Sequence, residues 1–473
     1  AMTEIFRHTA TEVHTALTKG DLTPLDCLDT LEARIAAVNA PVNALITLCF
    51  DRARVHARVL MKKPRAERGV LAGLPVPIKD LTDVSGVRST QGSRIFKDRI
   101  ADTSDLLVTH LEGQGGVVYA MSNTPEFGAG GHTFNDVFGM TRNPWDTRTS
   151  AAGSSGGAAV ALATGMAWLA HGSDLGGSLR NPASFCGIVG LRPSPGVVAA
   201  TPYGRIYGSL GAEGPMARNV SDLALLLDAM TGQEARDPLS LGVNGGSLHR
   251  DSIRQPALRR VAVSADLGIT PVDPEVAAII RAAARKLEQA GVIVEEAHPD
   301  LREAMNCFQV LRAAGYASMG QLLRDHRDLL KPEVIWNIEK GLKLSVDDIV
   351  IAEAQRTALF NKMHDFLGLY DALLCPATIV PPFPVEQRYV THCNGVEFES
   401  YVDWLLIVAV ATLCACPAIS IPCGFTASGL PVGLQMITRN RQDHRLLAMA
   451  KFAEDFFNLG AITPIEPRVR HVG

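Results

Sequence analysis

The chain has 473 residues and a net charge of −4; 47% of its residues are hydrophobic and 20% are charged. This composition allows a large buried core, and the length alone suggests roughly two to four domains. Because the net charge is small and no basic block is present, binding to nucleic acid or to an anionic membrane surface is not indicated.

Neither a secretory signal peptide nor a membrane-spanning segment is expected. Asp403 and Trp404 interrupt the most apolar stretch just before residues 405–416, which are too few to cross a bilayer. The nine cysteines are scattered and form no CxxC pair or His–Cys cluster of the kind that binds zinc. We therefore expect a cytoplasmic protein whose cysteines are small buried residues and which uses no metal or cofactor.

Residues 3–68 alternate helical patterns with short breaks and are expected to form packing helices on the flank of the molecule. Thr23 is the predicted N-cap of a helix that begins at Pro24 and ends near Val38, because proline suits the first helical position.

The first candidate for chemistry is Lys79, which ends an apolar strand over residues 74–78. Val76 and Ile78 share one face of this strand, so Lys79 and Asp80 point to opposite faces. A lysine acts as a base near neutral pH only if its surroundings lower its pKa from about 10.4 to roughly 7–8. Taken alone, Lys79 fits better an edge lysine whose ammonium group reaches solvent.

A helix over residues 105–115 and a strand over 116–121 follow the lysine strand. This strand–helix–strand order favours pairing that is at least partly parallel. The glycine-rich loop over 123–132 comes next and also fits a flexible connection without function. Its last residue, His132, suggests a Ser–His pair, but no aspartate has suitable spacing, so it is not assigned as a base.

Residues 148–192 are saturated with Gly, Ser and Ala, a composition that core building alone does not explain. Their pattern predicts a loop, a helix, a strand, a second loop and a second helix. Glycine allows positive φ and close approach to a ligand, and a serine after it either caps the next helix or directs its hydroxyl at a substrate. The two loops are Gly153-Ser154-Ser155-Gly156-Gly157 and Asp174-Leu175-Gly176-Gly177-Ser178.

The first of these loops matches G-x-S-x-G around Ser155, the pattern of a nucleophile elbow. An elbow requires a buried strand directly before it, whereas residues 143–150 are polar and turn-like. A phosphate-binding loop is also disfavoured, because no Lys-Ser or Lys-Thr pair closes the turn.

Three separated motifs together resemble the amidase signature family: Lys79 in PVPIKD, the GSSGG turn, and DLGGSLR-x-P ending at Pro182. Their order and spacing agree with the family, since 75 residues separate Lys79 from Ser154 and 24 separate Ser154 from Ser178. The resemblance covers almost the whole chain. It implies one α/β/α domain over residues 1–473 with a central mixed β-sheet flanked by helices. Within this domain, residues 3–68 would be the flanking helices, 69–235 the catalytic core and 301–367 a variable helical wall of the pocket.

The resemblance also implies a role for each matching residue. Ser178 would be the nucleophile, Ser154 after a cis peptide bond would relay the proton, and neutral Lys79 would be the base. The oxyanion hole would be formed by the backbone N–H groups of Leu175, Gly176, Gly177 and Ser178, and the acyl side of the pocket would be bordered by Gly128, Ala129 and Gly130.

Two charged neighbours and two departures from the family pattern complete the site prediction. Asp174 and Arg180 flank the second loop with opposite charges and are expected to support its shape. Ala152 stands where the family usually has glycine, a change that should be tolerated if its φ is negative. The second departure, at residues 121–123, lies where the family commonly has Lys-Thr-Asn, and we expect it to affect only the pocket wall.

The rest of the chain carries no further chemical motif. Tyr401 and Trp404 are expected in the core more than at an aromatic entrance to the pocket. The predicted elements are a helix opened by residues 214–222, a surface loop at 240–256, a strand–helix–strand unit at 260–263, 273–290 and 292–296, helices over 301–367, strands at 371–375, 418–422 and 430–437, and a helix at 443–456.

The sequence therefore predicts a metal-free amidase that cleaves the C–N bond of a small, uncharged or aryl-bearing amide through an acyl-enzyme on Ser178, with water as acceptor. Esters or carbamates suit the same machinery. One alternative is the glutamine-hydrolysing subunit of a tRNA-dependent amidotransferase, which needs partner subunits and a cationic group that the sequence does not identify. Another is a non-catalytic binding protein on the same scaffold, against which the intact Lys79, Ser154 and Ser178 argue. A homodimer is compatible with the resemblance.

Overall fold

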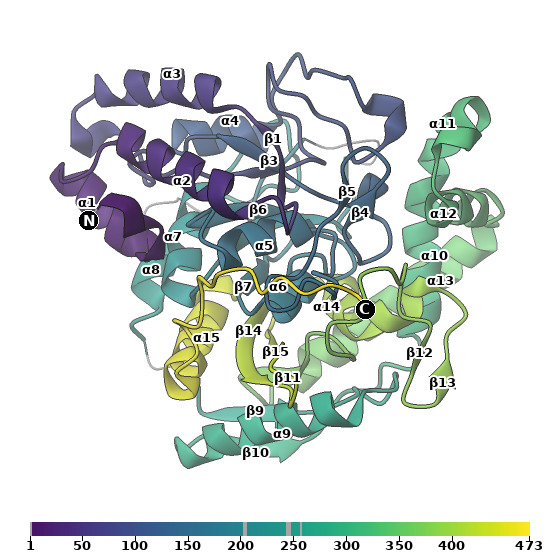
Figure 1. Cartoon of the computed structure of the whole chain (residues 1–473). Coiled ribbons are helices and arrows are strands. Elements are labelled where there is room, and N and C mark those ends of the chain that lie inside the picture. Colours follow the sequence, from purple (N-terminus) through teal and green to yellow (C-terminus); the bar gives the residue numbers. More distant parts are fainter. Residues whose placement is uncertain (1, 202–205, 243–246, 256–257) are drawn as a thin grey trace.

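An eight-stranded mixed sheet forms the centre of the molecule in the computed structural model, which describes residues 2–201, 206–242, 247–255 and 258–473 (Figure 1). Strands β9, β10 and β11 are parallel to one another, and all other neighbouring strands are antiparallel. The strand order is β10 (Ile293–Glu296), β9 (Arg260–Val263), β11 (Ala372–Pro376), β15 (Pro431–Ile437), β14 (Ala418–Phe425), β7 (Val189–Arg192), β8 (Ala212–Ala217) and β6 (Leu169–Asp174). The predicted mixed sheet is thus confirmed.

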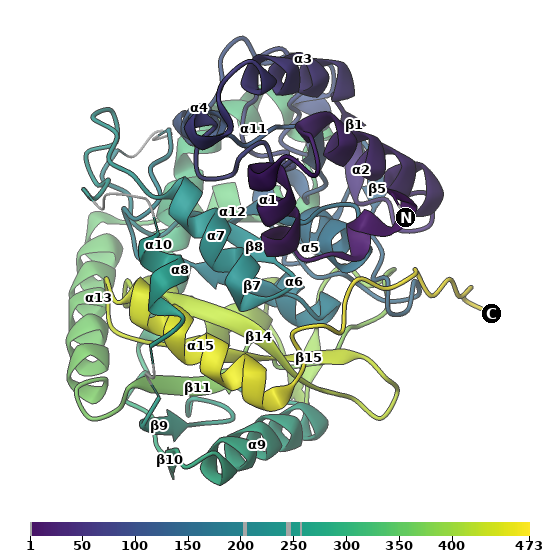
Figure 2. The same cartoon turned by 90° about the vertical axis from the view of Figure 1, so that its left-hand side faces the viewer.

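Helices cover both faces of this sheet. On one face, α7 (Val220–Met230) and α15 (Asp443–Phe457) lie side by side, and α9 (Pro274–Gln289) continues this layer beyond them (Figure 2). On the other face lie two short helices, α5 (Gly156–Ala163), made of small and apolar residues, and α6 (Arg180–Cys186). Every residue of α5 and α6 is buried, which explains why neither shows an amphipathic pattern.

A second, three-stranded sheet carries the lysine strand. Its order is β1 (Leu45–Leu48), β3 (Ala120–Ser122) and β2 (Ile78–Lys79). Strands β2 and β3 are parallel, as predicted, although they do not belong to the central sheet. Helices α1 (Ala10–Lys19), α2 (Pro24–Val38), α3 (Phe50–Met61) and α4 (Leu106–Gly113) lie around this sheet, and Thr23 caps α2 as predicted (Figure 1). The short 3-10 helices of this half are η1 (Met2–Arg7), η2 (Arg65–Glu67), η3 (Arg94–Phe96) and η4 (Glu126–Gly128).

The predicted helical segment 301–367 is confirmed and lies on the side of the central sheet opposite α7 and α15 (Figure 1). It contains α10 (Ala304–Tyr316), η5 (Ala317–Met319), α11 (Gly320–His326), η6 (Arg327–Leu329), α12 (Pro332–Leu342) and α13 (Val346–Phe366). A two-stranded hairpin, β12 (His392–Cys393) and β13 (Val396–Glu397), then leads to η7 (Tyr401–Leu405) and α14 (Leu406–Leu413). None of the helices in the described part of the chain is long and apolar enough to cross a membrane.

Two predictions for the middle of the chain are wrong. Residues 212–217 form β8, and α7 begins only at Val220. The strand was not predicted because Gly214 and Pro215 are unusual within a strand. The predicted loop 240–256 contains the short helix α8 (Leu248–Ser252), while residues 243–246 and 256 lie outside the described residues. The hairpin of β4 (Phe134–Asn135) and β5 (Gly139–Met140) was also not predicted.

The buried carboxylate of Asp222 on α7 binds the N-terminal end of α1. It accepts hydrogen bonds from the backbone N–H of Ala10 at 2.8 Å and of Thr11 at 2.9 Å, and from the Thr11 hydroxyl at 2.7 Å. These N–H groups belong to the first turn of α1 and have no partner within that helix. One continuous cluster of buried side chains consequently extends from Ile5 to Phe457.

Replacing Asp222 by alanine is expected to lower the free energy of unfolding by about 1.5–3 kcal/mol, because it leaves buried donors without an acceptor. Urea denaturation of Asp222→Ala measures this loss. Asp21→Ala, which removes an exposed carboxylate, is the control and should change the free energy by less than about 0.5 kcal/mol. Equal effects of the two substitutions would show that Asp222 does not hold α1.

Candidate active site

Lys79 lies at the end of β2 and is fully buried, which rules out the alternative of a solvent-reaching edge lysine. Its Nζ donates hydrogen bonds to three serine hydroxyls: Ser154 Oγ at 2.6 Å, Ser155 Oγ at 2.9 Å and Ser173 Oγ at 2.9 Å. Burial lowers the pKa of Lys79 to about 7, although nearby carboxylates act in the opposite direction. A substantial fraction of this lysine is therefore a neutral amine near neutral pH, as a proton acceptor must be.

A histidine joins the lysine strand to the central sheet. The backbone N–H of Lys79 donates to Nδ1 of His171 on β6 at 3.2 Å. The proton of this imidazole consequently resides on Nε2, which donates to Glu213 Oε2 at 2.6 Å. Glu213 is also the carboxylate that acts most strongly to raise the pKa of Lys79, against the larger effect of burial. The small and large sheets therefore meet at Lys79.

The first serine loop leads into α5 and adopts an unusual backbone. The Gly153–Ser154 peptide bond is cis. Ala152 has φ of +58°, so the condition of a negative φ at this position is not met, and a residue with a Cβ occupies the left-handed region that glycine prefers. Ser155 makes no N-cap hydrogen bond to α5; its hydroxyl contacts Lys79 instead. The helix-cap interpretation of this loop is therefore wrong for Ser155.

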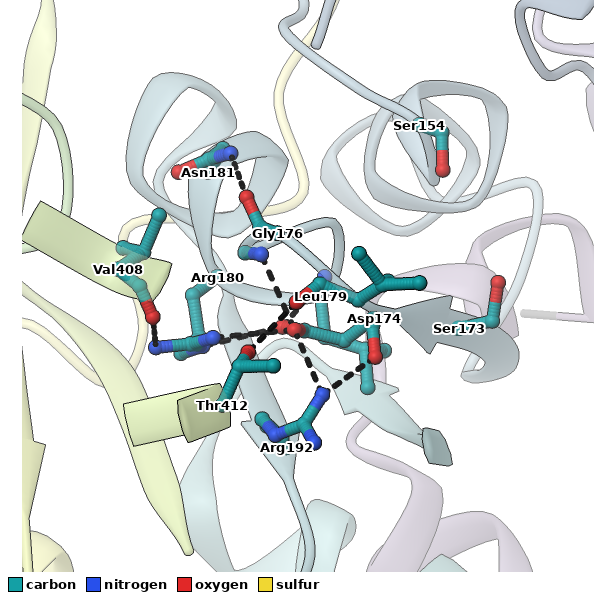
Figure 3. Close-up of polar contacts among 12 residues, drawn as sticks. Ser154, Ser173, Asp174, Gly176, Leu179, Arg180, Asn181, Arg192, Val408 and Thr412 are labelled. Carbon is teal, nitrogen blue, oxygen red and sulfur yellow. Dashed lines mark hydrogen bonds and ion pairs between the residues drawn. The ribbon is translucent and has the colours of Figure 1, made fainter. Parts of the chain in front are cut away.

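The second serine loop follows β6 and requires glycine at position 177. Gly177 has φ of +93°, and a Cβ there would lie 2.3 Å from Val408 Cγ2. Its N–H donates to Asp174 Oδ1 at 3.0 Å, which corrects the prediction that it belongs to the oxyanion hole (Figure 3). Among the hydrogen bonds of the described residues, the N–H groups of Leu175, Gly176 and Ser178 have no acceptor, and all three residues line one cavity.

A buried ion network holds the second loop in shape (Figure 3). The Arg180 guanidinium binds Asp174 through two hydrogen bonds of 3.0 Å, as the predicted support role requires. Arg192 on β7 adds a third contact, from Nη1 to Asp174 Oδ1 at 3.2 Å, which the sequence did not reveal. Burial alone would raise the pKa of Asp174, but Arg180 and Arg192 outweigh it and hold the pKa below its usual range.

Contacts from α14 and α6 orient the carbonyl groups of the same loop. Thr412 Oγ1 donates to the Leu175 carbonyl oxygen at 2.6 Å, and Asn181 Nδ2 donates to the Gly176 carbonyl oxygen at 3.4 Å (Figure 3). Arg180 Nη1 also binds the Val408 carbonyl oxygen at 2.8 Å. The Leu175 carbonyl and the Gly176 N–H belong to one peptide unit, so the bond from Thr412 directs this N–H to the opposite side.

Most of the predicted site residues line one cavity of about 220 Å³; Lys79 and Gly177 do not, and Lys79 is connected to the cavity through its hydrogen bond to Ser154. Ser154 and Ser178 both line it, but the described contacts include no hydrogen bond between their hydroxyls. Its wall contains Gly128, Ala129 and Gly130 from the predicted set, Phe308, Arg312 and Tyr316 from α10, and Tyr401, Val402 and Leu405 from η7. Arg312 was not predicted, because no motif surrounds it in the sequence.

Two other candidates, His132 and Trp404, do not line the cavity. His132 is buried, contacts Ser150 and the Val385 carbonyl oxygen, and has its pKa lowered by burial to about 4. Trp404 packs in the core against Phe185, as expected, whereas Tyr401 lines the cavity.

The departure at residues 121–123 does not touch the pocket wall. Ser122 lies opposite Lys79 in the pairing of β2 with β3, so the prediction for this segment is wrong.

Within the described ranges, no cluster of three or more His, Cys, Asp or Glu side chains is arranged to hold a metal ion. All nine cysteines are free thiols, and only Cys49 among them is not fully buried.

Comparison with known proteins gives consistent matches along the chain. A family model described as Amidase matches residues 26–447. An acylamidase from Rhodococcus erythropolis is 36% identical over 459 residues, which cover 95% of this chain and 96% of that protein. A glutamyl-tRNA(Gln) amidotransferase subunit from Alkaliphilus metalliredigens is 31% identical over 451 residues, which cover 88% of this chain and 90% of that protein. The crystal structure of a bacterial aryl acylamidase of the amidase signature family matches with a TM-score of 0.88 at 26% identity, covering 97% of this chain and 99% of that one.

Asp174→Asn is expected to lower the free energy of unfolding by about 3–5 kcal/mol, because two buried guanidinium groups lose their counter-charge. Asp80→Asn is the matched control: this carboxylate is buried too, but its hydrogen bonds come from Thr90, and burial raises its pKa to about 6. Removing its charge should therefore cost much less. Denaturant titration compares the two, and a similar loss in both would contradict the role given to the ion network.

Proposed function

Because this chain belongs to the amidase signature family and is an amidase that acts on carbon–nitrogen bonds, we propose that it works through an acyl-enzyme on Ser178. The observation that carries this proposal is the 2.6 Å hydrogen bond from Lys79 Nζ to Ser154 Oγ at the edge of the cavity that Ser178 also lines. A buried amine whose pKa is about 7 is suited to accept a proton there.

The proposed reaction has two halves. Ser178 Oγ attacks the amide carbonyl carbon while its proton passes through the Ser154 hydroxyl to neutral Lys79. The N–H groups of Leu175, Gly176 and Ser178 stabilise the negative oxygen of the tetrahedral intermediate. The proton then returns from Lys79 through Ser154 to the leaving nitrogen, the C–N bond breaks, and water releases the acyl group by the reverse use of the same groups.

The cavity supports a small substrate. Its volume of about 220 Å³ and the lining by Phe308, Tyr316 and Tyr401 suit an aryl-bearing or short acyl amide. The same oxyanion donors suit esters and carbamates, because they contact only the carbonyl oxygen. The glutamine-hydrolysing alternative is supported less, since the relative at 36% identity is an acylamidase. The homodimer stays a prediction, which size-exclusion chromatography tests.

Ser178→Ala and Lys79→Ala are each expected to lower kcat for 4-nitroacetanilide by about 10³-fold or more, because the nucleophile and the base act as a unit. Release of 4-nitroaniline measures this. Ser318→Ala, which removes an exposed hydroxyl on η5, is the control and should keep wild-type turnover. Full activity of either site variant would refute the assignment. A wild type that neither turns over amides nor reacts with a fluorophosphonate would favour the binding-protein alternative.

The kcat/KM of the wild type should rise with pH through an apparent pKa near 7, because protonated Lys79 cannot accept a proton. The Glu213 carboxylate acts to raise the pKa of Lys79, so Glu213→Gln should move this acidic limb to lower pH. Exposed Glu67→Gln serves as the control and should leave the profile unchanged. An acidic limb that stays in place or moves to higher pH in Glu213→Gln would contradict the assignment of Lys79 as the base.

A further inference from the structure

Arg312 brings a positive charge to the wall of the active-site cavity. It lies on α10, is only 5% exposed, and is the only charged side chain among the described residues that line this cavity. Phe308, one helical turn earlier on the same face of α10, approaches the second serine loop: a Cβ on Gly176 would lie 3.2 Å from Phe308 Cζ. Arg312 therefore lies one helical turn along α10 from the residue that approaches the second serine loop, and both residues line the same cavity.

The charge of Arg312 is held in place without being neutralised. Its Nη1 donates to Asn337 Oδ1 at 2.5 Å and to Tyr401 Oη at 3.2 Å, and its Nη2 donates to Gln309 Oε1 at 3.4 Å. These three bonds use three of the five N–H groups of a guanidinium, and Nε has no partner among the described residues. The aromatic rings of Tyr316, Trp336 and Tyr401 each have their centroid 5.6 Å from Arg312 Cζ.

No carboxylate forms an ion pair with Arg312 in the part of the chain that the structure describes. The contrast with the neighbouring ion network is clear, since Arg180 and Arg192 share the carboxylate of Asp174. A buried charge that lacks a counter-ion costs several kcal/mol, a cost that an anionic ligand would offset.

We propose that Arg312 binds a carboxylate of the substrate, so that the preferred substrates are amides with a carboxylate remote from the scissile carbonyl. The inference rests on the proposed function and narrows its substrate class: the aryl or acyl body remains, but the substrate is anionic. A guanidinium recognises a carboxylate through its planar array of N–H donors. The attraction between the two charges is stronger in a buried cavity than at a solvent-exposed surface.

The test compares pairs of substrates in which one member has a carboxylate where the other has a methyl group. One pair places the carboxylate on the acyl side, N-phenylsuccinamate against N-phenylbutanamide; the other places it on the leaving group, 4-acetamidobenzoate against 4-acetamidotoluene. The ratio to be measured is the kcat/KM of the anionic member divided by that of the neutral member. In the wild type it should be at least ten for one pair, mainly because KM is lower for the anionic member. Arg312→Gln should lower this ratio at least tenfold, and Arg312→Lys should give an intermediate ratio.

The ratio within one variant is independent of how much of that variant is folded. Arg218→Gln is the matched control, because Arg218 is a buried arginine outside the cavity that binds the backbone carbonyl oxygens of Phe6 and His8. It should keep the wild-type ratio. A wild-type ratio at or below one for both pairs, or an unchanged ratio in Arg312→Gln, would overturn the inference while leaving amide hydrolysis intact.

Binding measured without turnover separates this inference from the proposed function. Isothermal titration of the anionic member of each pair into Ser178→Ala should give affinity that is at least tenfold weaker in Ser178→Ala/Arg312→Gln. This loss would support the carboxylate site even if the wild type hydrolysed none of the four amides. Equal affinity in both proteins, or no binding to Ser178→Ala, would overturn it.

Discussion

The burial of one lysine is the constraint on which the rest of this structure depends. Lys79 has three serine hydroxyls around its Nζ and no solvent exposure, and the loss of hydration lowers its pKa to about 7. The three hydroxyls come from two distant segments, the loop before α5 and the end of β6. The packing of the small sheet against the central sheet therefore buries Lys79, the proposed base, and His171 at their junction holds the lysine strand in register.

A second site near this base has the opposite electrostatic character. Asp174 is as deeply buried as Lys79, yet it stays ionised because Arg180 and Arg192 compensate its charge. Its carboxylate accepts the Gly177 N–H and thereby shapes the loop that carries Ser178. The end of β6 thus contributes to both sites: Ser173 contacts Lys79, the proposed base, and Asp174 forms the ion network that shapes the loop. Both arrangements follow from which side chains meet at the C-terminal end of β6.

Local signals in the sequence predicted most of the elements and the reactive residues. The cap at Thr23 could be predicted because its signal lies within four residues, and Lys79, Ser154 and Ser178 could be proposed because each lies in a compact motif. The strand β8 was missed because Gly214 and Pro215 resemble a turn. Arg192 and Arg312 were missed for another reason. Asp174 lies 18 residues from Arg192, and Asn337 and Tyr401 lie 25 and 89 residues from Arg312, so only the folded chain shows these contacts. The positive φ of Ala152 depends likewise on the surrounding fold.

The identity of the atom that carries the acyl group tests the account most directly. A substrate with slow deacylation is mixed with the wild type, quenched in acid during the first turnover, and followed by intact-protein mass spectrometry and peptide mapping. The account predicts a mass increase of one acyl group, located on Ser178, that appears before steady-state turnover. An acyl group on Ser154 or Ser155, or multiple turnovers without any covalent adduct, would contradict it.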